Sequence, residues 1–294
     1  LEFRRVLFRS IIPNELFELA ELFPQESPLY IVGGFVRDYI DSKKESADID
    51  ITSALTPDEL SVILQKSKFK LTGASPRLGT MIVKGDRSYE YTAFRIDSYP
   101  VGNGVHAPNF VEFTKDIVKD AKRRDFKCNA IYFDIKKKKI IDPLCGCKDV
   151  ENKILNAVID PNIVLSQDGL RILRLIRMVS TLGYRVGEET LEAAKNLVLR
   201  LKDISVERIQ AELVKILDGD HVYKALCLMR ELKVIDIILP DLAKGNGMQQ
   251  NTKYHKYDVL EHTFKTVEAA PKEIRLAALF HDIGKIGIPD SILL

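Results

Sequence analysis

The chain has 294 residues, 46% of them hydrophobic, and a formal net charge of only +2. This length is enough for two or three domains with buried cores, and the weak net charge gives no global electrostatic argument for nucleic-acid binding. The long apolar stretch at 163–179 cannot be a simple membrane span, because it contains an aspartate and three arginines.

The termini and the cysteines bear on the origin and location of the chain. Residues 1–10 do not begin with Met and have no cleavage-site pattern, so we interpret them as a cloning or sequencing remnant. Residues 288–294 stop without a helix or strand terminator, so we expect a C-terminal truncation. The four cysteines lack the C-x-x-C spacing of a zinc site, which favours a reduced, cytoplasmic protein.

Residues 29–37 predict a phosphate-binding turn. An apolar strand leads into Gly33 and Gly34, and an amphipathic helix with Arg37 follows. Glycines at a strand-to-helix junction let the backbone approach an anion, and the helix N-terminus offers free N–H groups. The guanidinium fork of the arginine suits phosphate.

Asp48 and Asp50 open the strand that follows this helix. Side chains two residues apart on a strand point to the same face, so the two carboxylates project together while Ile49 and Ile51 face the core. Such a pair can hold two divalent cations. An isolated Asp-x-Asp is usually a solvated strand end, but beside a phosphate-binding turn it predicts a polyphosphate and metal site.

The next segment predicts a helix and a hairpin. Residues 56–64 begin with the capping box of a helix N-terminus, and a Gly-Asp pair joins the strands expected at 81–83 and 89–94. Glu90 points to the same face of its strand as Thr92, and it is a candidate third carboxylate beside the two aspartates. An exposed strand glutamate without a function is the alternative.

Residues 99–109 are rich in Gly, Pro and Asn and predict a mobile loop. Loops of this kind beside a phosphate site often close over a substrate. His106 would titrate near neutrality there, although a single loop histidine is more often only solvated.

A basic turn at 122–126 precedes the strand predicted at 131–135. Arg123 and Arg124 offer guanidinium forks for phosphate oxygens, and Asp125 offers a carboxylate for ribose hydroxyls. A basic surface turn without a ligand is the alternative.

From residue 146 the pattern is helical almost to the end, which predicts a domain boundary there. A helix that begins near Ser166 carries four polar side chains at three-residue intervals, Asp168, Arg171, Arg174 and Arg177. The first three lie on adjoining faces and offer one acceptor and two donor forks to a common ligand. Alternatively, the aspartate serves the helix dipole and the arginines pair with surface carboxylates.

The last segment contains side chains of metal-ligand type. His262 lies on a predicted helix, and His281 and Asp282 follow the apolar helix at 276–280. Imidazole and carboxylate groups on neighbouring helices can bind a divalent cation. A further ligand is not identifiable in the sequence.

Five ordered motifs resemble those of the class II CCA-adding tRNA nucleotidyltransferases and bacterial poly(A) polymerases. They are GGxVRD with DxD at 33–50, RRDF with NA at 123–130, DP with G and D at 142–149, DxxR at 168–171, and ERI with EL at 207–213. The segment around His262, His281 and Asp282 resembles the start of an HD phosphohydrolase domain. One departure is Gln167, which stands where the family usually has a glutamate that could orient Arg171.

The resemblance implies an α+β fold with three parts. A polymerase-beta-like nucleotidyltransferase head, with a mixed sheet and helices, would occupy residues 11–145. An all-helical neck and body would occupy 146–244 and serve base reading and RNA binding. The truncated start of a helical HD domain would occupy 245–294.

The same resemblance implies the addition of CMP and AMP, from CTP and ATP, to the 3′ end of tRNA without a nucleic-acid template. Asp48 and Asp50 would hold two Mg²⁺ ions, with Glu90 as a third catalytic carboxylate, and a second metal could bind His262, His281 and Asp282. The implied nucleotide-binding residues are Gly33, Gly34, Arg37, Asp38, Arg123, Arg124, Asp125, Asn129, Asp168, Arg171, Arg174 and Arg177. Among them, Asp168 and Arg171 would read the base edge.

Other functions are compatible with the sequence. Within the family, the chain could add only A, only C, or a poly(A) tail. From another class, it could be an HD metal-dependent phosphohydrolase or an RNA-binding fragment without transfer activity. No membrane partner is expected, and the oligomeric state is open.

Overall fold

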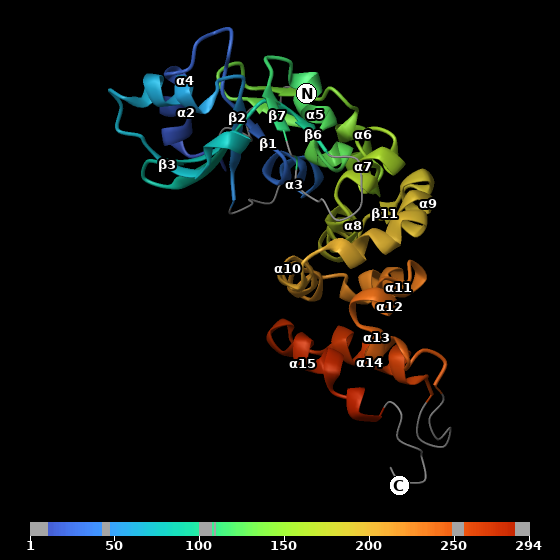
Figure 1. Ribbon diagram of the computed structural model, residues 1–294. Helices are drawn as coiled ribbons and strands as arrows, with labels where there is room; N and C mark the ends of the chain where they lie inside the picture. The colour runs from blue at the N-terminus through green and yellow to red at the C-terminus, as the bar shows by residue number, and fades with distance from the viewer. Residues whose placement is uncertain (1–10, 43–47, 100–107, 109, 249–255, 286–294) are drawn as a thin grey trace. The chain divides into compact units, whose positions relative to one another are not determined.

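The computed structural model describes residues 11–42, 48–99, 108, 110–248 and 256–285. The expected remnant at 1–10 lies outside these residues, and so does most of the loop expected at 99–109, including His106. Two compact units follow each other along the chain; the first ends at Asp160 and the second begins at Pro161 (Figure 1).

A seven-stranded mixed sheet forms the frame of the first unit, which confirms the fold predicted for the head (Figure 1). In spatial order its strands are β3 (Lys70–Ser75), β4 (Thr80–Lys84), β5 (Ser88–Ala93), β2 (Asp50–Ser53), β1 (Tyr30–Val32), β8 (Tyr132–Asp134) and β9 (Lys139–Ile141). The pair β2 and β5 is parallel, and the other neighbours in the sheet are antiparallel. Beside the sheet, β6 (Arg95–Ser98) and β7 (Phe110–Phe113) form an antiparallel ribbon.

Helices and turns complete the first unit. They are α2 (Asn14–Glu21), α3 (Gly34–Ser42), α4 (Pro57–Leu64), η1 (Pro76–Leu78), α5 (Ile117–Lys122), η2 (Lys127–Asn129) and α6 (Gly146–Glu151), followed by the short strand β10 (Ile154–Leu155). The predicted capping box of α4 is confirmed, because the Thr56 hydroxyl accepts from the Glu59 N–H and the Glu59 carboxylate accepts from the Thr56 N–H. Helix α3 packs on β1 and on α6, and α5 packs on β6.

The first compact unit extends beyond residue 146, where the helical pattern begins. Helix α6 packs on α3 and η2, and its first residue, Gly146, lies so close to η2 that a Cβ there would be 2.1 Å from the Lys127 carbonyl oxygen. The Asp142 carboxylate accepts from the N–H groups of Gly146 and Cys147, at 2.7 and 2.9 Å. Helix α6, the first helix after the predicted boundary, thus packs within the unit that contains the sheet.

The second unit is mainly helical. Its elements are α7 (Pro161–Gln167), α8 (Leu170–Leu182), β11 (Arg185–Val186), α9 (Glu188–Leu197), η3 (Val198–Asp203), α10 (Val206–Leu217), α11 (Val222–Glu231), α12 (Val234–Ile238), α13 (Pro240–Ala243), α14 (Val259–Ala269), η4 (Lys272–Ile274), α15 (Arg275–Phe280) and η5 (Ile283–Lys285). One face of α8 is a buried apolar stripe of Leu170, Leu173, Ile176 and Val179. Of the elements expected in an HD segment, α14 packs on α11 and α15 packs on α10, so they share this unit.

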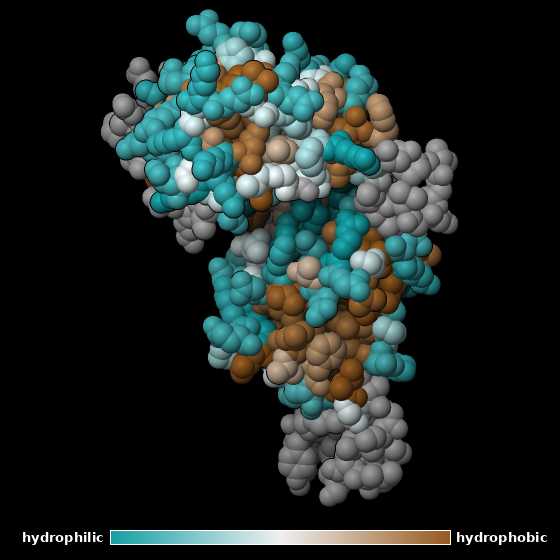
Figure 2. Space-filling model, turned by 60° about the vertical axis from the view of Figure 1, so that its left-hand side comes forward, coloured by the Kyte–Doolittle hydropathy of each residue, from teal (hydrophilic) through white to brown (hydrophobic). Residues whose placement is uncertain are grey.

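Apolar surface is visible on one face of the second unit (Figure 2). The exposed large apolar side chains of this unit include Leu199 on η3 and Val206 at the start of α10, which are 63% and 73% exposed. In the described ranges, all helices are too short or too polar to cross a bilayer.

A buried glutamate that the sequence did not reveal holds the β4–β5 hairpin. Glu15 on α2 is 6% exposed, and its carboxylate accepts from the backbone N–H groups of Asp86 and Arg87 and from the Tyr89 hydroxyl. A carboxylate in this position replaces the water that the turn would otherwise need.

Glu15→Ala is expected to lower the free energy of unfolding by about 3 kcal/mol, because two backbone N–H groups and a buried phenol lose a charged acceptor. Urea unfolding followed by circular dichroism measures this change. Glu18→Ala, at a position that is 59% exposed on the same helix, should change it by less than about 0.5 kcal/mol. Equal effects of the two substitutions would contradict the assignment.

Candidate active site

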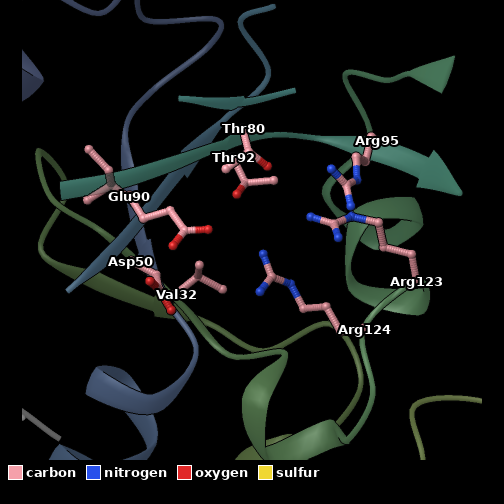
Figure 3. Close-up of a pocket in the computed structure, with 9 residues that line it drawn as sticks. Val32, Asp50, Thr80, Glu90, Thr92, Arg95, Arg123 and Arg124 are labelled. Carbon is pink, nitrogen blue, oxygen red and sulfur yellow. The ribbon is translucent and has the colours of Figure 1, made fainter. Parts of the chain in front are cut away.

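A polar cavity of about 290 Å³ opens in the first unit where β2 and β5 run side by side. It is lined by Val32, Asp50, Ile51, Thr80, Glu90, Thr92, Arg95, Arg123 and Arg124. Its charges are separated: the carboxylates of Asp50 and Glu90 lie on one side, and three guanidinium groups face them from the other (Figure 3). A cavity with an acidic and a basic wall suits a ligand that carries phosphate together with a cation.

The acidic wall follows from strand register. Asp50 and Glu90 are direct partners in the parallel pair β2–β5, so their side chains leave the sheet next to each other. Asp48 and Asp50 are exposed while Ile49 and Ile51 are buried, which confirms the predicted alternation. The strand begins at Asp50, however, so Asp48 precedes β2 and does not line the cavity. The structure thus brings Glu90 to Asp50.

The basic wall consists of Arg95 from β6 and of Arg123 and Arg124 from the end of α5 (Figure 3). Two buried carboxylates support it. Asp97 pairs with Arg95 at 2.8 Å, and Asp120 pairs with Arg123 at 2.7 Å and Arg124 at 3.0 Å. Burial and the nearby Arg123 lower the pKa of Arg95. Because the guanidinium groups outnumber the carboxylates, this wall attracts anions.

The glycine turn has the predicted form, but its two glycines differ. Gly33 has φ +82°, a left-handed conformation that only glycine adopts without strain, and it joins β1 to α3. Gly34 is the first residue of α3, and a Cβ there would meet the guanidinium of Arg37 at 3.5 Å. Arg37 therefore folds back toward the turn.

A chain of hydrogen bonds links the predicted phosphate binder to the predicted ribose reader. Arg37 pairs with Asp38 and donates to Asn129 Oδ1 at 2.5 Å, and Asn129 donates to Asp125 Oδ1 at 3.2 Å. Asp125 is only 6% exposed and also accepts from the Phe126 N–H. The predicted phosphate and ribose residues therefore form two sets. Arg37, Asn129 and Asp125 are joined by hydrogen bonds, and Arg123 and Arg124 line the cavity. Ribose recognition by Asp125 stays a prediction.

In the second unit, the helix expected to begin near Ser166 is two helices. Helix α7 ends at Gln167 and α8 begins at Leu170, and Asp168 lies in the break between them. Its Oδ1 accepts from the Leu170 N–H at 3.0 Å, an Asx-turn contact just before α8, whose N-cap residue is Gly169. Its Oδ2 accepts from Arg208 on α10 at 3.0 Å. The prediction of one continuous helix was wrong because the aspartate competes for the backbone N–H.

Arg171 is 7% exposed and points back along α7. Its Nη1 donates to the carbonyl of Val164 and to Oε1 of Gln167, both at 3.0 Å. Gln167 stands where the family usually has a glutamate, and it still orients the Arg171 guanidinium, through an amide oxygen in place of a carboxylate oxygen.

The other two arginines of α8 are half-buried. Arg177 pairs at 3.1 Å with Glu212 of α10; the alternative interpretation expected a surface carboxylate, but this one is buried. Two residues of the fifth motif thus contact the segment that carries the fourth motif: Arg208 pairs with Asp168, and Glu212 pairs with Arg177. Nucleotide binding by Arg174 and Arg177 stays a prediction.

The three side chains of the C-terminal segment do come together. His262 on α14 and His281 after α15 place Nε2 at 3.5 and 3.2 Å from the Asp282 carboxylate, and all three ligand atoms lie within 4.8 Å of one another. His281 Nδ1 contacts the Ala278 carbonyl oxygen at 2.7 Å, which fixes the ring. This spacing suits a shared cation, and metal binding there stays a prediction.

Several residues of the site were missed in the sequence. No sequence motif pointed to Arg95, Asp97 or Asp120. Asp120 does precede Arg123 and Arg124 by three and four residues, which is the spacing of helical ion pairs. Tyr132, which contacts Asp120 from β8, could not have been found from spacing, because only the sheet brings it to α5.

A buried thiol lies directly before Asn129. Burial raises the pKa of the Cys128 thiol to about 12, whereas its ordinary value is 9.0. With dithiobis-nitrobenzoate at pH 8, we expect rapid modification of the exposed Cys145 and modification of Cys128 only after unfolding, because roughly one buried thiol in ten thousand is ionised. Absorbance at 412 nm separates the two thiols in variants that keep only Cys145 or only Cys128, because Cys147 and Cys227 are partly exposed and must also be replaced by Ser. Equal rates in the folded protein would contradict this.

The fold and the cavity define a nucleotidyltransferase head domain joined to a helical region. The family model of the poly(A) polymerase head domain matches residues 29–156, and a model described as a probable RNA and SrmB-binding site of polymerase A matches residues 183–245. A CCA-adding enzyme of Geobacillus sp. (strain WCH70) is 36% identical over 227 residues, which are 77% of this chain and 54% of the relative. One of Oceanobacillus iheyensis is 33% identical over 83% of this chain and 60% of the relative.

Solved structures agree with this grouping. A crystal structure of the Bacillus stearothermophilus CCA-adding enzyme in complex with CTP matches with a TM-score of 0.73 and 29% identity, over 93% of this chain and 64% of that one. A tRNA nucleotidyltransferase complexed with a primer tRNA and an incoming ATP analog shares the fold, with a TM-score of 0.65 at 23% identity over 90% and 75% of the two chains. The chain belongs to the family of the CCA-adding enzymes and poly(A) polymerase head domains. It spans 54% to 60% of the length of the two curated relatives above.

Proposed function

We propose that this chain adds CMP and AMP, from CTP and ATP, to the 3′ ends of tRNA in the cytoplasm. The carrying observation is the cavity whose acidic wall, Asp50 and Glu90, faces a wall of three arginines. Similarity to CCA-adding enzymes, including one solved in complex with CTP, supports the substrates. Four free cysteines are compatible with a reducing compartment.

The residues fit the Mg²⁺ ions that this reaction requires. Carboxylate oxygens are the ligands Mg²⁺ prefers, and Asp50 and Glu90 supply two of them next to each other, with Asp48 two residues before β2. We propose that these three carboxylates hold the metal. When bound, Mg²⁺ favours ionisation of the RNA 3′-hydroxyl and neutralises charge on the triphosphate.

The chain's other residues bind and orient the reactants. Arg123 and Arg124 would contact the triphosphate. The turn at Gly33 and Gly34 and the side chain of Arg37 would also bind its phosphates. The 3′ oxygen forms a bond to the α-phosphorus, the bond to the bridging oxygen breaks in line, and pyrophosphate leaves. Asp168 and Arg171 would hydrogen-bond the base edge, so that a wrong base leaves buried polar groups unpaired.

The test is incorporation of labelled CTP and ATP into tRNA that lacks its 3′-terminal nucleotides, in the presence of Mg²⁺. We expect products longer by two and then three nucleotides. Absence of label in the RNA, with protein that is folded by circular dichroism, would refute the proposal. Product lengths on a sequencing gel separate CCA addition from A-only, C-only and poly(A) activity.

The C-terminal cluster supports a second proposal, a divalent metal site of HD type. The geometry of His262, His281 and Asp282 favours it, because their ligand atoms lie within 4.8 Å of one another. Calorimetric titration with Mn²⁺ should show a site that is lost in His281→Ala and kept in Asp50→Asn. Phosphatase activity that survives Asp50→Asn would extend the proposal to hydrolysis, and the absence of Mn²⁺ binding would end it.

A further inference from the structure

A buried carboxylate lies behind the arginines of the basic wall. Asp120, on α5, has a fully buried side chain. Its Oδ1 accepts from Arg123 Nε at 2.7 Å, and its Oδ2 accepts from Arg124 Nη2 at 3.0 Å. Each oxygen of one carboxylate thus fixes one guanidinium group that lines the cavity.

Tyr132 contacts both Asp120 and Arg124. Its hydroxyl donates to Asp120 Oδ2 at 2.7 Å and accepts from Arg124 Nε at 3.1 Å, and its ring centroid lies 5.3 Å from the guanidinium carbon. Within the described residues, the hydrogen bonds of Arg124 involve only Nε and Nη2. Nη1 therefore keeps its donors for a ligand, and the guanidinium points into the cavity (Figure 3).

This arrangement has an electrostatic consequence. Burial alone would raise the pKa of Asp120, but the guanidinium groups of Arg124 and Arg123 hold it below its ordinary value, so the carboxylate stays charged. Without that charge the two arginines would repel each other and regain rotamer freedom, which a ligand would have to remove again on binding. Fixed guanidinium groups bind phosphate without this cost.

We propose that Asp120, assisted by Tyr132, is a positioning residue that orients Arg123 and Arg124 for the triphosphate of the incoming nucleotide. The inference rests on the proposed function, because it assumes that this cavity binds the triphosphate. It assigns to both residues a task that involves no contact with the substrate.

Asp120→Asn and Tyr132→Phe test the inference in the full chain. Affinities for ATP and for AMP, each with Mg²⁺, are measured by calorimetry. We expect ATP affinity to fall about 30-fold in Asp120→Asn and about fivefold in Tyr132→Phe, with AMP affinity unchanged, because only the β- and γ-phosphates need the oriented arginines. Asp134→Asn and Tyr91→Phe are matched controls, because they remove a buried carboxylate and a buried hydroxyl elsewhere in the same sheet.

Unchanged ATP affinity in both variants would overturn the inference. An equal loss of affinity for ATP and AMP would also overturn it, because such a loss indicates a general loss of structure. If Asp120→Asn does not fold, Tyr132→Phe decides alone, because it removes only one oxygen atom. The two proposals can fail separately: wild-type protein that binds ATP but transfers no nucleotide refutes the proposed function, while the ratio of ATP to AMP affinities still decides this one.

Discussion

Asp50→Asn is expected to lower the rate of nucleotide transfer to tRNA by about 10³-fold, since the loss of a metal-holding carboxylate removes roughly 4 kcal/mol of transition-state stabilisation. Asp50 lines the cavity and is the register partner of Glu90. An amide of the same shape keeps the strand but not the charge. Single-turnover incorporation of labelled CTP measures the effect.

Glu90→Gln distinguishes a catalytic carboxylate from an exposed strand residue at that position. If Glu90 shares the cation with Asp50, its loss should lower transfer by about 10²-fold. Asp86→Asn, at an exposed hairpin turn, is the control and should leave transfer unchanged. A rate for Asp50→Asn close to that of the wild type would remove the acidic wall from the mechanism.

Arg171→Ala is expected to lower kcat/KM for CTP and ATP by about 10³-fold and to relax discrimination against UTP. Two hydrogen bonds from a charged fork contribute about 1.5–3 kcal/mol each, and an unpaired base edge is penalised as well. The side chain is buried and is held by Val164 and Gln167, so its direction is fixed before the base arrives. Competition between labelled CTP and UTP gives the selectivity.

Gln167→Ala tests how that direction is set. Removal of the amide acceptor frees one side of the Arg171 guanidinium, and kcat/KM should fall about tenfold, whereas Gln167→Glu should retain activity. Arg185→Ala, an exposed arginine of the same unit, is the control. If Arg171→Ala kept its preference for CTP over UTP, base reading would have to reside elsewhere.

The local elements were largely predictable because their signals are short-range. The capping box of α4, the turn at Gly33 and the alternation around Asp50 depend on neighbours within a few residues, and all are present. The continuous helix expected near Ser166 was a misprediction, because the Asx turn of Asp168, also a short-range signal, outweighed helical periodicity. Helical periodicity alone also gave no sign that α6 packs with the sheet unit rather than with the helices that follow it.

The sequence by itself determined the class of chemistry, since the carboxylates, the glycine turn and the arginines occur in recognisable order. Only the tertiary structure decided which of them meet. It paired Asp50 with Glu90 across 40 positions, and it placed Tyr132 of β8 against Asp120 of α5. Strand order and helix packing are set by the burial of the whole apolar surface, so no local spacing could reveal that a buried carboxylate stands behind the arginines of the cavity.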